Sequence, residues 1–188
     1  MEDENNLWIK RIYENCSGCR RCEIACSLHH EGKIWPEASR VRVFMFVPGV
    51  EIPHLCFQCN DYPCVEECPE EALSVDVHTG AVITDKLKCT ACGICINLCP
   101  GRVPHLHPQD DCIVICDLCG GSPKCTVACQ EGKWNTLILL EGQESESEKV
   151  PAIIPKELAH ETARTLLGEK ATDEVYEWLM VMQENFWK

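Results

Sequence analysis

The chain has 188 residues and 17 cysteines, and its 30 acidic residues against 17 basic ones give a formal net charge of −13. This balance argues against a nucleic-acid partner, which requires a basic face. The start of the chain is acidic and polar, and no apolar stretch approaches the roughly 20 residues that span a bilayer, so neither a secretory signal nor a membrane anchor is expected. We therefore expect a cytoplasmic protein, whose reduced cysteines bind metal or carry redox chemistry.

Sixteen of the cysteines form four quartets, and such a repeat governs the interpretation of the chain. Two quartets have the spacing C-x2-C-x2-C-x3-C, and the other two have x4 or x5 between the second and third cysteine. In chain order the quartets are Cys16, Cys19, Cys22 and Cys26; Cys56, Cys59, Cys64 and Cys68; Cys89, Cys92, Cys95 and Cys99; and Cys116, Cys119, Cys125 and Cys129. Three thiolates so close in sequence can bind three corners of a [4Fe–4S] cubane, whereas zinc sites use separated pairs and an odd cysteine count disfavours a disulfide framework.

The fourth cysteine of each quartet is predicted to bind a different cluster from the first three. In two-cluster ferredoxins the fourth cysteine of such a run ligates the other cluster. The second and third quartets are adjacent, which predicts one cluster at Cys56, Cys59, Cys64 and Cys99 and its neighbour at Cys68, Cys89, Cys92 and Cys95. By elimination the first and fourth quartets pair, which predicts the sets Cys16, Cys19, Cys22 and Cys129, and Cys26, Cys116, Cys119 and Cys125.

Residues 73–84 predict a β-hairpin between the second and third quartets. Residues 73–77 and 81–84 alternate as half-buried strands do, and Gly80 lies in the turn.

Cys112 stands apart from the quartets, in an apolar segment four residues before Cys116. A lone cysteine in such a place most often packs as a small hydrophobe, so we do not expect it to be a ligand.

Other polar residues near the quartets allow more than one interpretation. The nearby cations either offset the negative charge of cluster thiolates or are solvated surface residues, as most Lys and Arg are. These cations are Arg20, Arg21, Lys86, Lys88 and Lys124. The neighbouring histidines are expected to form hydrogen bonds rather than to bind metal; they are His29, His30, His54, His105 and His107. No phosphate-binding loop or catalytic motif is recognisable, so no catalytic residue is predicted and the chain alone is not expected to be an enzyme.

The last fifth of the chain changes in character. Residues 135–140 predict an apolar strand, and residues 141–149 form an acidic, Ser-containing linker. Pro155 predicts the start of a helix over residues 156–167 that Gly168 ends. A second helix from Thr172 would have an apolar face made of Val175, Trp178, Leu179, Met182 and Phe186. This face either packs on the body of the protein or docks onto a partner subunit or another copy, held near it by the linker.

Together these elements predict an α+β fold of two ferredoxin-like modules, one inserted in the other, with a C-terminal helical tail. Residues 1–141 form the four-cluster domain in this prediction, with the inner module at about residues 53–108. Residues 142–188 form the linker and the helical docking tail. Aromatic residues make up only 6% of the chain, so the clusters are expected to contribute to holding the fold together.

The four motifs resemble those of a known family. They read CSGCRRCEIACSLHHEG, CFQCNDYPCVEECPEEAL, CTACGICINLCP and CDLCGGSPKCTVAC, and in this order they are similar to the four-cluster iron–sulfur subunits of the dimethyl sulfoxide reductase and formate dehydrogenase type. Within that type, Arg20-Arg21, the segment 27–32 and the short fourth motif look most similar to the small subunit of tungsten-dependent aldehyde oxidoreductase. The resemblance implies four [4Fe–4S] clusters held by the sixteen cysteines. Gln130 departs from the family pattern, which usually has proline after the last cysteine, and this loosens the expected turn.

The resemblance also implies a function. It indicates a non-catalytic subunit that passes single electrons between a large tungsten- or molybdenum-pterin catalytic subunit and an acceptor subunit or ferredoxin. A flavin subunit that passes electrons to a nicotinamide, or further copies of the chain joined through the tail, are the other implied partners. The alternatives are a free-standing polyferredoxin carrier, or the same role in a class II benzoyl-CoA reductase, hydrogenase or carbon monoxide dehydrogenase complex.

Overall fold

The computed structural model describes residues 7–47, 49–141 and 153–186, in which short strands pair into four two-stranded antiparallel sheets. The strands are β1 (Leu7–Arg11), β2 (Arg42–Val47), β3 (Val50–His54), β4 (Leu73–Val75), β5 (Val82–Thr84), β6 (His105–Leu106), β7 (Ile113–Val114) and β8 (Leu137–Glu141). The helices are α1 (Arg21–Glu31), α2 (Pro63–Glu66), α3 (Ile94–Leu98), α4 (Lys124–Glu131), α5 (Pro155–Leu167) and α6 (Glu169–Phe186), with 3-10 turns at Tyr13–Asn15, Pro36–Ala38 and Leu118–Gly121. This mixture of helices and short strands confirms the predicted α+β class.

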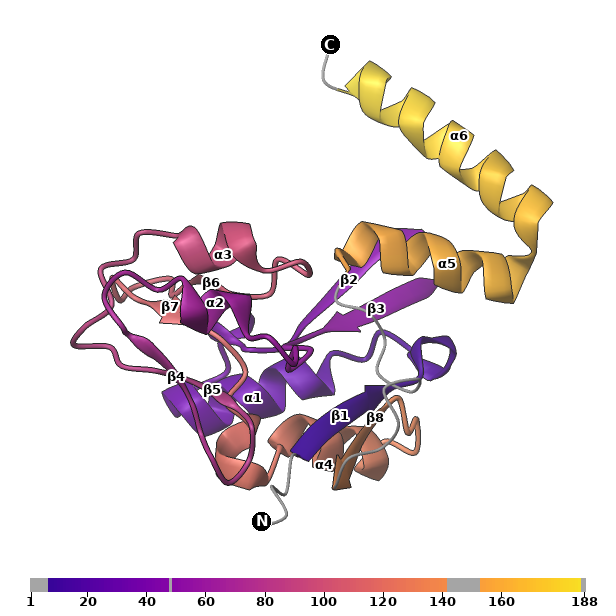
Figure 1. Ribbon diagram of the computed structural model, residues 1–188. Coiled ribbons are helices and arrows are strands. Elements are labelled where there is room, and N and C mark those ends of the chain that lie inside the picture. Colours follow the sequence, from indigo (N-terminus) through magenta and orange to yellow (C-terminus); the bar gives the residue numbers. More distant parts are fainter. Residues whose placement is uncertain (1–6, 48, 142–152, 187–188) are drawn as a thin grey trace.

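Strands β1 and β8 join the two ends of the segment 7–141. They pair from Leu7 opposite Glu141 to Arg11 opposite Leu137, and Ile9 and Leu137 are buried. Helices α1 and α4 pack against each other beside this sheet (Figure 1). Because α1 carries the end of the first quartet and α4 the end of the fourth, segments far apart in sequence bring these two quartets together.

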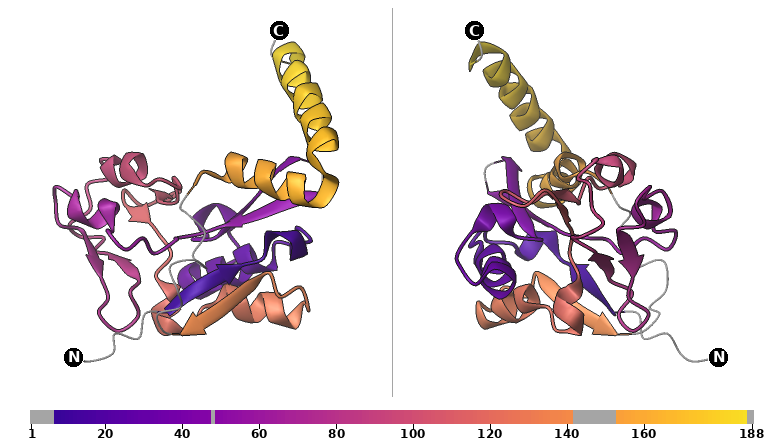
Figure 2. Two further views of the ribbon diagram at one scale, coloured as in Figure 1. Left: turned by 45° about the vertical axis from the view of Figure 1, so that its right-hand side comes forward. Right: turned by 90° about the vertical axis from the view of Figure 1, so that its left-hand side faces the viewer.

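The second and third quartets form a separate group with the β4–β5 hairpin. Helix α2 packs against α3, and β4 pairs with β5 from Leu73 opposite Thr84 to Val75 opposite Val82. The hairpin predicted at residues 73–84 is therefore confirmed, with strands shorter than expected. Figure 2 shows this group, in magenta, on the side of the molecule away from α6.

A further hairpin, β2–β3, supports the first helix of the tail. Val47, Val50 and Ile52 on this hairpin are buried, and α5 packs on both strands. Helix α5 confirms the predicted helix over residues 156–167, whereas α6 begins at Glu169 rather than at Thr172. Helix α6 then extends away from the body (Figure 1). Residues 142–149 of the predicted linker lie outside the described residues, as do the side chains of residues 179–186.

The described residues form two hydrophobic clusters in the interior, and cysteines belong to both. One includes Phe57 and Leu158 together with Cys64, Cys95 and Cys99. The other is built around Ile9, Leu55 and Leu137 and includes Cys26, Cys116, Cys125 and Cys129. Most of the fourth cysteines of the quartets thus lie in the core, where water cannot solvate a thiolate. No described helix is long and apolar enough to cross a membrane.

Candidate metal centres

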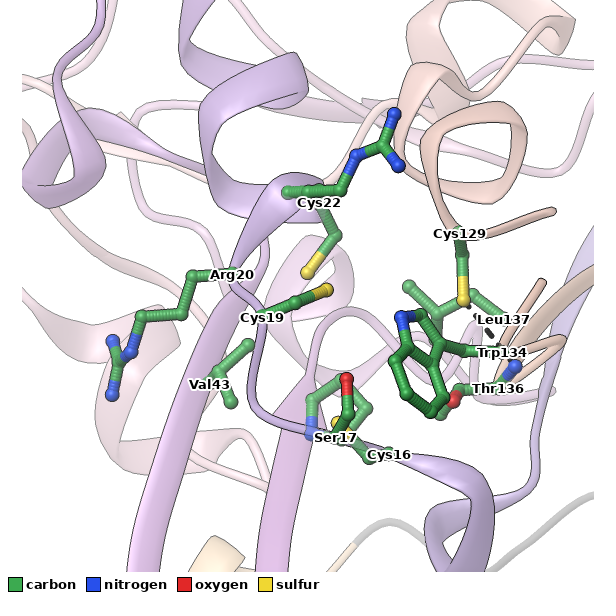
Figure 3. Close-up of a pocket in the computed structure, with 12 residues that line it drawn as sticks. Cys16, Ser17, Cys19, Arg20, Cys22, Val43, Cys129, Trp134, Thr136 and Leu137 are labelled. Atoms are coloured by element: carbon green, nitrogen blue, oxygen red, sulfur yellow. Dashed lines mark hydrogen bonds between the residues drawn. The ribbon is translucent and has the colours of Figure 1, made fainter. Parts of the chain in front are cut away.

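Four cysteines surround one pocket at the beginning of α1. Three come from the first quartet, at and just before the first turn of α1, and the fourth comes from α4. Figure 3 shows the sulfur atoms of Cys19, Cys22 and Cys129 turned toward the same space, with Cys16 at its edge and Trp134 beside it. We call this set site I: Cys16, Cys19, Cys22 and Cys129.

A second pocket is lined by cysteines of the second and third quartets. Leu73, Ile94 and Ile113 form apolar parts of its wall. We call this set site IV: Cys68, Cys89, Cys92 and Cys95. Neighbouring thiols act on Cys95, whose pKa is raised to about 11 first by burial and then by the three other cysteines of the site.

The remaining eight cysteines, of which five are buried and three are partly exposed, make up the other two predicted sets. We call them site II (Cys26, Cys116, Cys119 and Cys125) and site III (Cys56, Cys59, Cys64 and Cys99). In site II, burial and then Cys26 raise the pKa of Cys125 well above its ordinary value. In site III, burial and then Cys56 and Cys99 raise the pKa of Cys64 to about 12. The structure brings the cysteines of sites I and IV to one pocket each. For sites II and III it shows electrostatic coupling, which also reaches Cys22 and Cys95 of neighbouring sites. The crossed pairing and the ligation of metal stay predictions.

The fourth cysteine of every quartet accepts a backbone hydrogen bond at its sulfur. Each donor is an amide on the segment that follows the quartet's last helix or turn. The four bonds run from Arg40 N to Cys26 Sγ (3.2 Å), Ala72 N to Cys68 Sγ (3.3 Å), Val103 N to Cys99 Sγ (3.4 Å) and Thr136 N to Cys129 Sγ (3.3 Å). An N–H bond to sulfur stabilises the thiolate, and such bonds are among the factors that set the potential of iron–sulfur clusters.

The backbone also turns in the same way within each quartet. The residue just before the second cysteine has a left-handed conformation in all four: Gly18 (φ 67°), Gln58 (φ 51°), Ala91 (φ 55°) and Leu118 (φ 53°). For a residue with a side chain this conformation costs roughly 1–2 kcal/mol. Strain of this kind persists only where the surroundings require it and is typical of ligand-binding loops. Here the turn brings the first two cysteines of a quartet to the same space.

The donor set fits iron–sulfur clusters in chemistry as well as in number. Burial raises the pKa of Cys16 and of Cys56 to about 11 and that of Cys22 to about 12, so the protein alone does not favour these thiolates. Cys26 differs, because hydrogen bonds from His30, Ser39 and Arg40 outweigh its burial and lower its pKa. A bound metal centre supplies the positive charge that a buried set of four thiolates otherwise lacks. The four sets of four sulfurs match four [4Fe–4S] clusters.

Neighbouring sites are close enough to act on each other electrostatically. Cys22 of site I raises the pKa of Cys125 in site II, and Cys56 of site III raises that of Cys116 in site II, in each case after burial. Cys95 of site IV likewise contributes to the raised pKa of Cys64 in site III. These electrostatic couplings link site I to site II, site II to site III and site III to site IV. Cys19 at one end and Cys92 at the other are exposed, whereas Cys116 and Cys125 in the middle are buried.

The cations singled out in the sequence are mostly engaged with carboxylates. Arg20 pairs with Glu23 at 3.1 Å, Arg21 with Glu131 at 3.3 Å and Lys86 with Asp110 at 3.1 Å. Lys124 donates to the Ser122 hydroxyl at 3.4 Å. These contacts favour their interpretation as surface residues that pair locally.

Two polar side chains approach the inner sites instead. His30 Nε2 lies 3.7 Å from Cys119 Sγ and 3.4 Å from Asp117 Oδ1, so the histidine contacts site II as a hydrogen-bonding residue. Arg11 is buried beside Cys56 and was missed by the sequence analysis, because basic residues are normally exposed and nothing in the local sequence marks this one.

Cys112 lies outside the four sites. Cys112 is only 2% exposed. It packs in the interior, as predicted for a cysteine that acts as a small hydrophobic residue. Its carbonyl oxygen accepts a hydrogen bond from the amide of His107 at 2.9 Å, which closes the loop between β6 and β7.

Comparison with known proteins identifies relatives of this chain. Residues 48–136 match the family described as a 4Fe-4S dicluster domain. The polyferredoxin-like subunit of the aliphatic sulfonate oxidoreductase of Pyrococcus furiosus is 48% identical over 168 residues, which cover 89% of this chain and 97% of that subunit. The thiosulfate reductase electron transfer subunit PhsB of Salmonella typhi is 32% identical over 133 residues, or 62% of this chain and 67% of PhsB. A chain in the active site complex BamBC of benzoyl coenzyme A reductase matches 92% of this chain at 20% identity with a TM-score of 0.43.

Proposed function

Because this chain belongs to the polyferredoxin-like iron–sulfur subunits of oxidoreductases and contains their 4Fe-4S dicluster domain, we propose a route for the electrons that it carries. The chain is an iron–sulfur electron-transfer subunit with four [4Fe–4S] clusters. These clusters, when bound, supply one-electron transfer. The protein contributes the spacing, order and surroundings of the sites that hold them.

The proposed route follows the order of sites I, II, III and IV. The exposure of Cys19 and Cys92 supports a terminal site at each end of the row, accessible to an electron donor or acceptor. The middle of the row is closed off, since Cys116, Cys125 and Cys64 are buried in the hydrophobic interior. In this proposal sites I and II belong to an outer module and sites III and IV to the module inserted in it. The packing of α1 on α4 and of α2 on α3 supports that division.

The proposed partner is a large catalytic subunit with a tungsten or molybdenum pterin. The resemblance of the motifs to the small subunit of aldehyde oxidoreductase supports an aldehyde-oxidising or acid-reducing partner. The name of the Pyrococcus furiosus relative supports a second substrate class, an aliphatic sulfonate. In both cases this chain stays non-catalytic and exchanges electrons with a further carrier, a flavin subunit or a ferredoxin, in the cytoplasm.

Helix α6 is the proposed docking element of the tail. Helix α5 already packs on the β2–β3 hairpin, whereas α6 extends from the body and leaves Trp178 57% exposed. Aromatic anchors of this kind carry protein interfaces. A chain that ends at Gly168 should keep its clusters but elute separately from the catalytic subunit, or from further copies of itself, in size-exclusion chromatography. Unchanged co-elution would remove α6 from the interface.

Metal analysis of the protein, purified without oxygen from its own cells together with whatever accompanies it, tests the proposal. About 16 iron and 16 sulfide per chain are expected from four cubanes, with tungsten or molybdenum in an accompanying large subunit. The chain offers a matched control, because Cys112→Ala should keep all the iron whereas Cys116→Ala should lose part of it. Iron without a partner would favour the free polyferredoxin, and zinc in place of iron would contradict the assignment of the sites.

A further inference from the structure

Arg11 is a charged side chain in the interior of the protein. It ends strand β1, and its side chain is 9% exposed. Its Nη2 donates hydrogen bonds to the carbonyl oxygens of Leu55, at 3.2 Å, and of Cys56. The guanidinium lies over the ring of Phe57, 4.3 Å from its centre. Arg11 therefore reaches from the β1–β8 sheet to the beginning of the second quartet.

The positive charge of Arg11 has no carboxylate partner in the part of the chain that the structure describes. Among the residues that the structure describes, no Asp or Glu oxygen forms an ion pair with it, and its Nε is buried without a hydrogen-bond acceptor. Arg40 has the same exposed fraction but pairs with Glu31. Buried charges are normally paired. We therefore look for the anion that pairs with Arg11 in the metal centre that the neighbouring cysteines would bind.

Site III begins at the residue that Arg11 contacts, because the guanidinium donates to the carbonyl oxygen of Cys56. Four cysteine thiolates and an oxidised cubane core together carry a net charge of about −2. Two hydrogen-bonded carbonyl groups and an aromatic face hold the guanidinium in place, so its charge cannot move away to solvent.

We propose that Arg11 is the countercharge of site III and raises the reduction potential of the cluster bound there. This inference rests on the proposed function, because it requires a cluster on Cys56, Cys59, Cys64 and Cys99. Reduction adds one negative charge to the site. A fixed cation therefore stabilises the reduced state more than the oxidised state, and the effect is large in a buried region where screening is weak. Arg11 acts through the electrostatics of the site and is not itself a ligand.

The test compares Arg11→Gln with Arg11→Lys in the intact, cluster-loaded protein. Both replacements keep a hydrogen-bond donor, but only lysine keeps the charge. A redox titration followed by electron paramagnetic resonance should show one of the four clusters harder to reduce in Arg11→Gln, by about tenfold in its reduction equilibrium constant, which is about 59 mV for a one-electron couple. Arg11→Lys should restore most of this shift. The affected signal should be the one that Cys64→Ser perturbs, since Cys64 belongs to site III.

Arg164→Gln is the matched control. Arg164 lies on α5, is half-exposed and pairs with Asp173 at 3.6 Å, so the same change of charge occurs away from the sites. A shift in Arg11→Gln no larger than in this control, or an equal shift of all four signals, would overturn the proposal. Loss of iron from both Arg11 variants would assign the residue to folding and would overturn it too, whereas loss from Arg11→Gln alone would support a role of the charge. A wild-type protein without four clusters would instead contradict the proposed function.

Discussion

Replacing Leu158 by alanine is expected to destabilise the whole protein, although the residue lies in the tail. Leu158 is on α5, its side chain is 2% exposed, and it belongs to the same hydrophobic cluster as Ile52 and Phe57. Cys64 and Cys99 of site III are part of that cluster as well. A cavity beneath α5 therefore removes packing from the region that holds site III.

The magnitude follows from the burial of the side chain. Truncating a fully buried leucine to alanine costs about 2–5 kcal/mol, through lost transfer free energy and the cavity left behind. In a protein of this size each kcal/mol lowers the unfolding midpoint by about 2–4 °C, so a decrease of about 4–20 °C is expected. Trp178→Ala is the control, because Trp178 on α6 is 57% exposed and its loss should change the stability by less than about 1 kcal/mol.

Anaerobic melting curves measured by far-ultraviolet circular dichroism, at one scan rate because unfolding with cluster loss is irreversible, provide the comparison. The iron content of each variant is measured before heating, so that a loss of clusters during purification is recognised. If Leu158→Ala and Trp178→Ala unfolded at the same temperature, α5 would not be part of the folded body. The whole tail from residue 153 onward would then have to be considered a docking segment.

Three other perturbations test the sites and their surroundings. Cys68→Ser and Cys99→Ser should change different signals in the reduced protein, because the crossed pairing assigns them to sites IV and III; identical effects would contradict it. Removing iron with a chelator should abolish cooperative unfolding, since cysteines form part of both hydrophobic clusters, and an unchanged melting curve would show that the fold does not depend on metal. Glu31→Gln should cost about 3–5 kcal/mol, because it leaves the buried Arg40 without its carboxylate. Burial raises the pKa of Glu31, but Arg40 and His107 outweigh burial and hold the pKa below its ordinary value. The difference in stability from wild type should therefore be complete at pH 7 and shrink as the pH falls through the lowered pKa. A difference that persists in acid would refute this role.

Local sequence signals predicted the elements whose causes are local. Gly80 marks the turn of the β4–β5 hairpin, and Pro155 and Gly168 bound α5. The β1–β8 sheet could not be found in this way, because its two strands lie at opposite ends of the segment 7–141 and only the folded chain brings them together. The β2–β3 hairpin was also missed; β3 contains Pro53, a residue that is atypical inside a strand.

The cysteine spacing predicted which residues gather, but not the backbone that gathers them. Of the four left-handed residues before a second cysteine, only Gly18 carries a sequence signal for that conformation. Gln58, Ala91 and Leu118 carry none, because their surroundings, rather than local preference, keep them in a conformation that costs energy. The backbone amides that bond to the sulfurs are likewise invisible in sequence, since every residue except proline has one.

The distribution of charge distinguishes the ends of the row from its middle. Arg20 near site I and Lys86 near site IV pair with carboxylates, so the terminal sites receive little net positive charge from them. Exposed sites need less, because water and salt screen the charge of a thiolate-bound centre there. In the interior that screening is absent, and Arg11 beside site III is a buried cation without a carboxylate partner among the described residues. The charge of Arg11 thus lies where the solvent cannot act, and the two kinds of site should respond differently to salt. The potentials of sites I and IV should shift with ionic strength, whereas that of site III should depend on Arg11.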